Sequence, residues 1–193
     1  MPKGISEQNM EEEAWPEVAV QQLQIAFTIM AALAIDGWIR CYGACLQPEP
    51  PKFNTVYSFR QLTSVDDWSM QGEEFYVGLP LGKSYGNVQP QFGASITPQG
   101  DLWAGVGATY TRHFGRNQRN YVELAIMPGF YHQGDGVYLG DRPALLRSWI
   151  GFGRELKNGN ALTFFIDHRS NGYSGDGPNP GIESIGFNYQ VRH

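Results

Sequence analysis

The sequence predicts an all-β fold, an eight-stranded antiparallel outer-membrane β-barrel with an N-terminal leader or helix. Three observations support this prediction: a composition rich in glycine and aromatic residues, eight segments of strand length, and alternation of apolar with polar or small side chains. Successive side chains of a strand point to opposite faces, so a membrane barrel needs this alternation to face lipid outside and a polar interior. A soluble lipocalin-like barrel would show a similar pattern, and periodicity alone leaves that alternative open.

Composition limits the protein class. The 193 residues include 24 glycines, 13% aromatic residues and only 17% charged residues, which favours a single β-rich domain over a helical or disordered chain. The formal net charge of −5 argues against a dedicated nucleic-acid-binding protein, so no nucleic acid partner is expected.

The N-terminal segment differs from the rest of the chain. Residues 1–47 are interpreted as a leader or an N-terminal helical segment with an uncertain boundary, and residues 48–193 as the barrel domain. The apolar run from Ile25 to Ile35 is about half of the roughly 20 residues that a spanning helix needs, a length suited to a signal-peptide core. Cys41 and Cys45 lack neighbouring metal ligands, so we expect no metal there and no cofactor.

The strands are expected after a proline-rich break at residues 48–52, and they are separated by turn signals. In chain order they cover residues 54–63, 73–81, 87–97, 101–113, 119–131, 144–156, 160–169 and 182–192. Tight turns are expected at 98–100, 115–117 and 157–159, and longer loops at 133–143 and 171–181. An even number of strands, each near the 9 to 11 residues or so that cross a bilayer obliquely, is typical of small membrane barrels, which close without a pore.

Several polar and aromatic residues have two interpretations. Asp167 is expected in an interior polar network, whereas the following arginines either contact lipid phosphate or pair inside the barrel: Arg147, Arg154 and Arg169. Three aromatic residues either anchor the barrel at the membrane interface or pack structurally: Trp103, Trp149 and Tyr173.

Four further residues are expected to have structural roles. Asp135 and Asp176 are expected to form turns rather than to bind calcium, because no complete set of ligand positions follows either of them. His113 and His132 are interpreted as solvated or interfacial residues at strand ends rather than as catalytic groups.

The last two predicted strands place three reactive groups among apolar residues. Alternation puts His168 and Ser170 on one apolar face, and it puts Glu183 on an apolar face of the next strand. A serine hydroxyl becomes a nucleophile when a base accepts its proton, and a histidine held by a carboxylate is the usual base in acyl transfer. Antiparallel pairing would bring Glu183 beside His168, and Asn171 could donate a hydrogen bond to the oxyanion.

This constellation resembles the PagL family of lipid A 3-O-deacylases, which are eight-stranded outer-membrane barrels. The resemblance rests on Asp167-His168-Arg169-Ser170-Asn171-Gly172 and Asn179-Pro180-Gly181-Ile182-Glu183-Ser184, and more loosely on Met127-Pro128-Gly129-Phe130-Tyr131. It implies an outer-membrane esterase that hydrolyses an ester-linked acyl chain of lipid A, at the 3-O position, and therefore lipid A or lipopolysaccharide as the partner.

The resemblance also implies roles for single residues. Ser170 would be the nucleophile, His168 the general base, Glu183 the carboxylate that orients the histidine, and Asn171 the oxyanion donor. The site would face the membrane, with the substrate acyl chain along four residues: Phe164, Ile166, Phe187 and Tyr189.

Two other readings and one possible assembly remain. A non-enzymatic small β-barrel for lipid binding or membrane anchoring would carry His168 and Ser170 merely at a strand end. A soluble lipocalin-like binder would hold its ligand inside the barrel. A homodimer is also possible.

Overall fold

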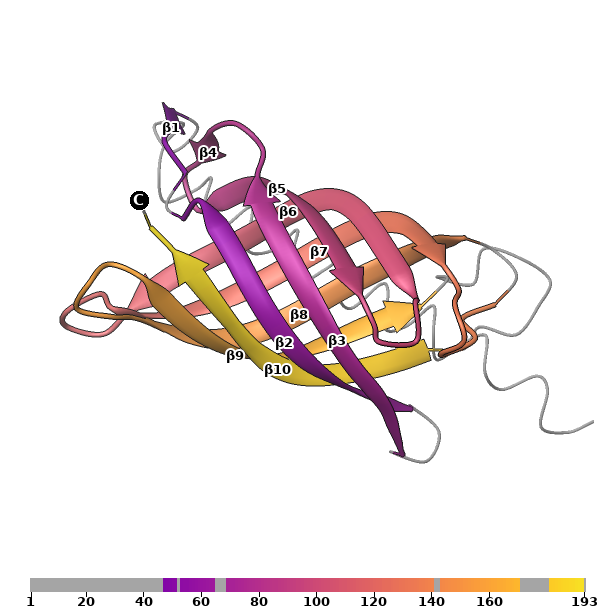
Figure 1. Ribbon diagram of the computed structural model, residues 1–193. Helices are drawn as coiled ribbons and strands as arrows, with labels where there is room; N and C mark the ends of the chain where they lie inside the picture. The colour runs from indigo at the N-terminus through magenta and orange to yellow at the C-terminus, as the bar shows by residue number, and fades with distance from the viewer. Residues whose placement is uncertain (1–46, 52, 65–68, 141–142, 171–180, 193) are drawn as a thin grey trace, which may run out of the picture.

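The chain forms a closed antiparallel barrel (Figure 1). The computed structural model describes residues 47–51, 53–64, 69–140, 143–170 and 181–192. Within them the strands are β1 (Pro48–Glu49), β2 (Thr55–Ser64), β3 (Met70–Pro80), β4 (Ser84–Tyr85), β5 (Val88–Ile96), β6 (Leu102–Phe114), β7 (Asn120–His132), β8 (Ala144–Glu155), β9 (Ala161–Ser170) and β10 (Gly181–Val191). The eight long strands are hydrogen-bonded in the order β5-β3-β2-β10-β9-β8-β7-β6, and pairing of β5 with β6 closes the barrel. These residues contain no helix long and apolar enough to cross a bilayer.

The eight predicted strands are confirmed, with the largest difference at the start of β3. This strand begins at Met70 rather than at the predicted position 73. Its first part contains Gly72, which has a φ of 125°. The pairing of β2 with β3 shifts register there, between Leu62 and Thr63. A glycine in a strand often marks such a bulge, which interrupts the alternation that identifies strands in the sequence. The short strands β1 and β4, which pair with each other, were not predicted.

The outer surface of the barrel carries a continuous apolar belt. Seven neighbouring strands contribute one residue each to a single cross-strand row: Phe152, Phe164, Phe187, Phe59, Phe75, Ile96 and Leu102. Each of these side chains is between 45% and 58% exposed. Soluble proteins rarely expose a contiguous apolar surface of this extent, whereas a membrane barrel requires an apolar band facing lipid. The belt therefore favours the membrane barrel over the soluble lipocalin-like alternative.

The barrel interior is filled by charged and aromatic side chains. Arg147 donates from Nε to Asp167 Oδ2 over 2.7 Å, and Arg169 Nη1 lies 2.8 Å from Glu74 Oε1. Arg60 also pairs with Asp167, and Arg147 with Glu74. The prediction of an interior network around Asp167 is confirmed, and Arg147 and Arg169 pair inside the barrel rather than with lipid phosphate.

Two of the aromatic residues with two interpretations lie inside the barrel. Trp103 and Trp149 are 1% and 4% exposed, so the interpretation of these residues as interfacial anchors is wrong and structural packing is correct. Trp149 donates from Nε1 to Glu123 Oε1 over 2.9 Å. Strand alternation explains this result, because both residues occupy inward-facing positions of their strands.

The other residues with two interpretations lie near strand ends. Arg154 is exposed on the outer face of β8, His132 is exposed at the end of β7, and Asp135 is an exposed loop residue. His113 is partly buried at the end of β6, where its Nε2 lies 3.0 Å from Glu155 Oε1, so it is less solvated than predicted. Tyr173 and Asp176 lie outside the described residues.

The two rims of the barrel differ. The site rim joins β2 to β3, β5 to β6, β7 to β8 and β9 to β10, and it includes the connections 133–143 and 171–180. The opposite rim joins β3 to β5, β6 to β7 and β8 to β9, and the chain ends there after β10 (Figure 1). Tight turns at Gly100 and Gly159 have φ values of 85° and 88°, as glycine permits. Outer-membrane barrels have longer loops on their extracellular side, so the site rim is expected to face outward.

Candidate active site

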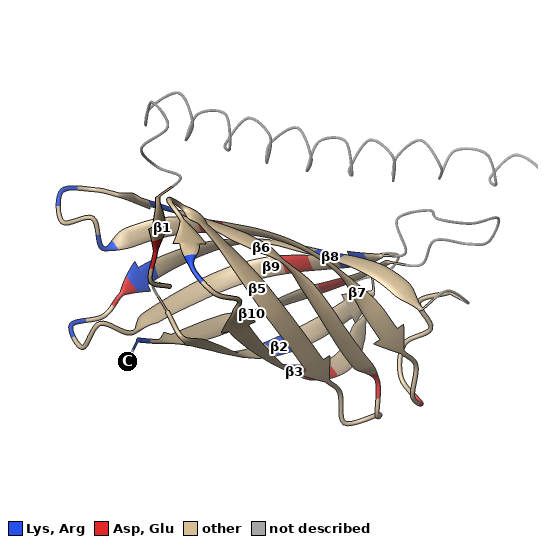
Figure 2. Cartoon of the chain, turned by 90° about the horizontal axis from the view of Figure 1, so that it is seen from above, with Lys and Arg blue, Asp and Glu red and all other residues tan. Residues whose placement is uncertain are grey.

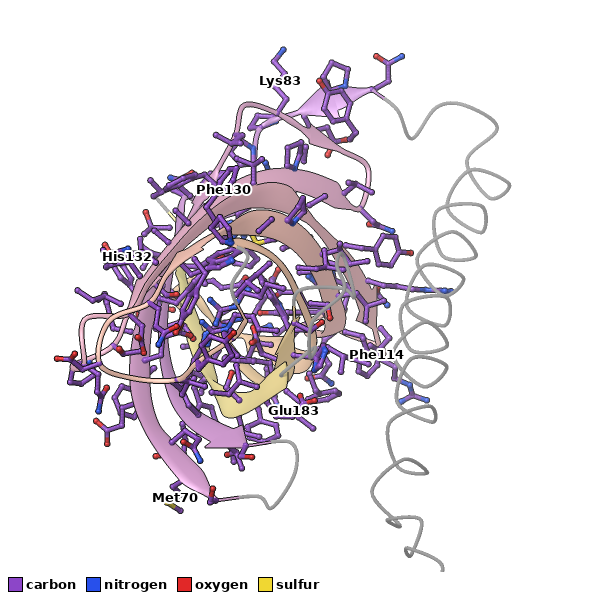
Figure 3. All side chains as sticks on the ribbon, turned by 90° about the vertical axis from the view of Figure 1, so that its right-hand side faces the viewer. Met70, Lys83, Phe114, Phe130, His132 and Glu183 are labelled. Atoms are coloured by element: carbon purple, nitrogen blue, oxygen red, sulfur yellow. The ribbon has the colours of Figure 1, made fainter. Side chains whose placement is uncertain are left out.

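The strongest candidate site lies where β9 ends and β10 begins. These strands pair in a register that sets His168 opposite Glu183 and Ser170 opposite Gly181. The Nδ1 atom of His168 lies 2.8 Å from Glu183 Oε1. The two side chains are 33% and 23% exposed on the outer face, at the rim that faces the viewer in Figure 3. The contact between His168 and Glu183, which was expected from antiparallel pairing of the two strands, is therefore present.

Ser170 lies on the same strand face as His168, two residues further along β9. A rise of about 3.3 Å per residue separates their Cα atoms by roughly 7 Å. Ser170 is only 7% exposed, far less than the other outward-facing residues of β9. Among the hydrogen bonds of the described residues, none joins Ser170 to His168, and catalytic hydrogen bonds often tighten only when substrate binds. Asn171 lies outside the described residues.

A second hydroxyl group lies close to His168. Ser148 of β8 is directly opposite His168 in the β8–β9 register, while Leu146 is opposite Ser170. His168 is therefore flanked by Glu183 on one neighbouring strand and by Ser148 on the other. Sequence reasoning missed Ser148, although its spacing from Leu146 and Ile150 shows that it shares their face of β8.

An apolar wall runs from this site along the outer face of β9 and β10. Phe164 and Phe187 are directly opposite each other, with ring centroids 5.4 Å apart. Ile166, which is 50% exposed, lies between this pair and His168 along β9. Tyr189 lies further toward the opposite rim, where its hydroxyl accepts a hydrogen bond from Asn160 Nδ2 over 2.6 Å.

The described residues contain no group of three or more His, Cys, Asp or Glu side chains arranged to hold a metal ion. The chemistry that they do offer is a hydroxyl, an imidazole and a carboxylate at the edge of an apolar wall. This set of groups is suited to acyl transfer.

Fold and site together define a small outer-membrane β-barrel with a serine and a histidine–carboxylate pair on its lipid-facing side. The model of the lipid A 3-O-deacylase (PagL) family matches residues 56–192, and the chain belongs to this family. Membership implies an acyl hydrolase of the outer membrane whose substrate is lipid A. The protein is therefore located in the outer membrane.

The fold is similar to that of a solved PagL structure. The crystal structure of the outer membrane enzyme PagL aligns with a TM-score of 0.54 and 18% identity, covering 72% of this chain and 99% of that one. A de novo designed transmembrane β-barrel aligns with a TM-score of 0.46 and 11% identity, over 75% of this chain and 100% of the design. The outer membrane protein Ail of Yersinia pestis aligns with a TM-score of 0.39 and 11% identity, over 72% and 99%. No curated protein sequence matches the chain.

Proposed function

We propose that this protein is a carboxylic ester hydrolase that removes the 3-O-linked acyl chain of lipid A through a Ser170–His168–Glu183 triad. The observation that carries the proposal is the 2.8 Å contact between His168 Nδ1 and Glu183 Oε1 on the lipid-facing side of the barrel. A histidine–carboxylate pair on the lipid-facing side is unusual, because the polar side chains of a membrane barrel normally face its lumen.

The triad assigns a distinct step to each group. Glu183 accepts a hydrogen bond from His168 Nδ1–H, so the imidazole presents Nε2 as the proton acceptor. As Ser170 Oγ attacks the ester carbonyl carbon, its proton passes to His168 Nε2, and Asn171 donates to the oxyanion. Collapse of the tetrahedral intermediate breaks the bond to the 3-hydroxyl oxygen of the sugar, which takes the proton from His168. Water then attacks the acyl-enzyme, releases the fatty acid and restores Ser170.

The apolar wall would hold the acyl chain during this reaction. Phe164 is six residues before Ser170, which corresponds to roughly 20 Å along the strand. A fatty acyl chain attached at Ser170 would therefore lie first against Ile166 and then against Phe164 and Phe187. Tyr189 would contact the far end of a longer chain. The substrate would reach the site sideways from the membrane, because charged and aromatic side chains fill the lumen.

The test is the release of fatty acid from purified lipid A by the full chain in detergent, with the mass of lipid A measured before and after incubation. Ser170→Ala is expected to abolish release while the far-ultraviolet circular dichroism of the barrel is unchanged. Ser148→Ala provides a matched control, because Ser148 is also a hydroxyl residue beside His168. Full activity of Ser170→Ala would overturn the triad, and loss of activity only in Ser148→Ala would move the nucleophile to β8.

The same measurement separates the hydrolase from a non-enzymatic barrel that binds lipid or anchors another protein. In that case wild-type protein would fold and insert, yet the mass of lipid A would not change.

A further inference from the structure

Exposed positive charge in the described part of the barrel lies at one end. Among the described residues, every exposed lysine or arginine lies at the opposite rim: Lys83, Arg112, Arg116, Arg119, Arg154, Lys157 and Arg192. In Figure 2, blue segments gather at the end of the barrel where the C-terminus lies. The three other described arginines are buried in the interior network. Toward the site rim the exposed charges of the described residues are carboxylates, such as Glu73 and Asp135.

Two of these arginines belong to the lipid-facing side of the wall. In the registers of β6, β7 and β8, Phe114 aligns with Arg154 through Asn120, and Arg112 aligns with Phe152 through Val122. Arginine and phenylalanine thus alternate in a two-by-two arrangement, which we call the rim patch (Arg112, Phe114, Phe152 and Arg154). The two phenylalanine rings have centroids 5.6 Å apart, and they are 38% and 56% exposed.

The rim patch combines two chemistries that meet at the edge of a bilayer. Phenylalanine side chains are favourable where the acyl region begins, and aromatic residues form girdles at both interfaces of membrane barrels. The planar guanidinium of arginine presents paired donors that match a phosphate group. An arginine on the lipid-facing side is strongly unfavourable only near the bilayer midplane, so Arg154, the next-to-last residue of β8, is tolerated beside headgroups.

We propose that the opposite rim, centred on the rim patch, binds the phosphate groups of anionic glycerophospholipids in the leaflet that faces away from lipid A. The charge of the rim is complementary to an anionic lipid surface, which attracts lysine and arginine residues close to the membrane. The site rim, which lacks exposed cations among the described residues, offers no such complementarity. The inference does not depend on the triad, because the rim patch and His168 lie at opposite ends of the wall.

Native mass spectrometry of the full chain tests the inference. The protein is released from micelles that contain equal amounts of phosphatidylglycerol and phosphatidylcholine with identical acyl chains, and the lipids that remain bound are counted. The wild-type protein is expected to retain phosphatidylglycerol preferentially. Each arginine is expected to contribute about fivefold to the ratio of bound phosphatidylglycerol to bound phosphatidylcholine. The double variant Arg112→Gln, Arg154→Gln is therefore expected to lose both contributions.

Two controls make the result specific. Glu73→Gln also changes one exposed charge, but toward the site rim, and it is expected to retain the wild-type lipid preference. Ser170→Ala is expected to show the wild-type lipid preference whether or not Ser170 is the nucleophile. A failure of the hydrolase proposal would therefore leave the lipid preference unchanged. Equal retention of both lipids by the wild-type protein, or an unchanged preference in a folded double variant, would overturn the inference.

Discussion

Arg147 and Asp167 form an ion pair inside the barrel, with Nε donating to Oδ2 over 2.7 Å, at the residue that precedes the outward-facing His168. Asp167 also binds Arg60 and accepts a hydrogen bond from Ser184 Oγ at 3.3 Å. One carboxylate therefore connects strands β2, β8, β9 and β10 on their inner side. Because neighbouring side chains of β9 point to opposite faces, the same short segment is fixed from inside by ion pairs and presents its reactive groups outside.

Asp167→Asn is expected to destabilise the barrel strongly. The substitution leaves Arg147 and Arg60 with less negative charge in a buried network, and breaking a buried ion pair in this way costs about 3–5 kcal/mol. Urea unfolding of the protein in lipid vesicles would measure the loss. Asp135→Asn, at an exposed loop position, serves as the control and should change the free energy of unfolding by less than about 0.5 kcal/mol. Equal effects of the two variants would show that the interior network contributes little to stability.

Val106→Arg tests whether the outer face contacts lipid. Val106 is 53% exposed, and it pairs with Phe92 near the middle of β5. Arginine at the bilayer midplane costs about 2–4 kcal/mol, whereas the same change on the surface of a soluble barrel would cost little. Reversible folding into phosphatidylcholine vesicles provides the measurement, with Val106→Leu as the apolar control. Indistinguishable stabilities of the two variants would contradict the lipid-facing assignment.

Strand alternation was sufficient to predict the strands and the shared face of His168, Ser170 and Glu183, because the period of two is independent of the partners of each strand. It was also sufficient to place Asp167 inside. The ion-pair partners of Asp167 could not be predicted in the same way. Arg60 and Arg147 lie on other strands, and their contact depends on barrel closure and register, which the pattern within one strand does not contain.

The position of Trp103 shows a signal that was overlooked. A Cβ atom added at Gly105 or Gly129 would collide with the Trp103 ring, so the indole occupies space that these glycines leave open inside the barrel. Alternating glycines beside a tryptophan thus indicate an inward ring rather than an interfacial anchor.

The leader or helix in residues 1–47, the homodimer and the role of Asn171 stay predictions.

Gly107→Ala is expected to weaken the contact between β6 and β7. A Cβ atom at position 107 would collide with the Ile126 carbonyl oxygen and approach Met127 Cα, both of which belong to the backbone of β7. Backbone atoms held in a barrel cannot move aside as a flexible side chain does, so the overpacking should cost about 1–3 kcal/mol. Thermal unfolding followed by circular dichroism would show the loss as a lower midpoint. Ala104→Gly, on the exposed face of the same strand, is the comparison and should cost no more than about 1 kcal/mol.

Glu183→Gln is expected to lower kcat for lipid A deacylation with little change in KM. The amide of glutamine cannot stabilise the imidazolium that forms when His168 takes the proton of Ser170, and it can hold the imidazole in the wrong tautomer. Because proton transfer by a positioned group contributes about 10²–10⁴-fold, the loss should fall in that range. Steady-state kinetics with Glu183→Gln and Glu183→Asp would measure it, since aspartate keeps the charge and should restore part of the rate. If Glu183→Gln instead raised KM and left kcat unchanged, Glu183 would contact the lipid A headgroup rather than orient His168.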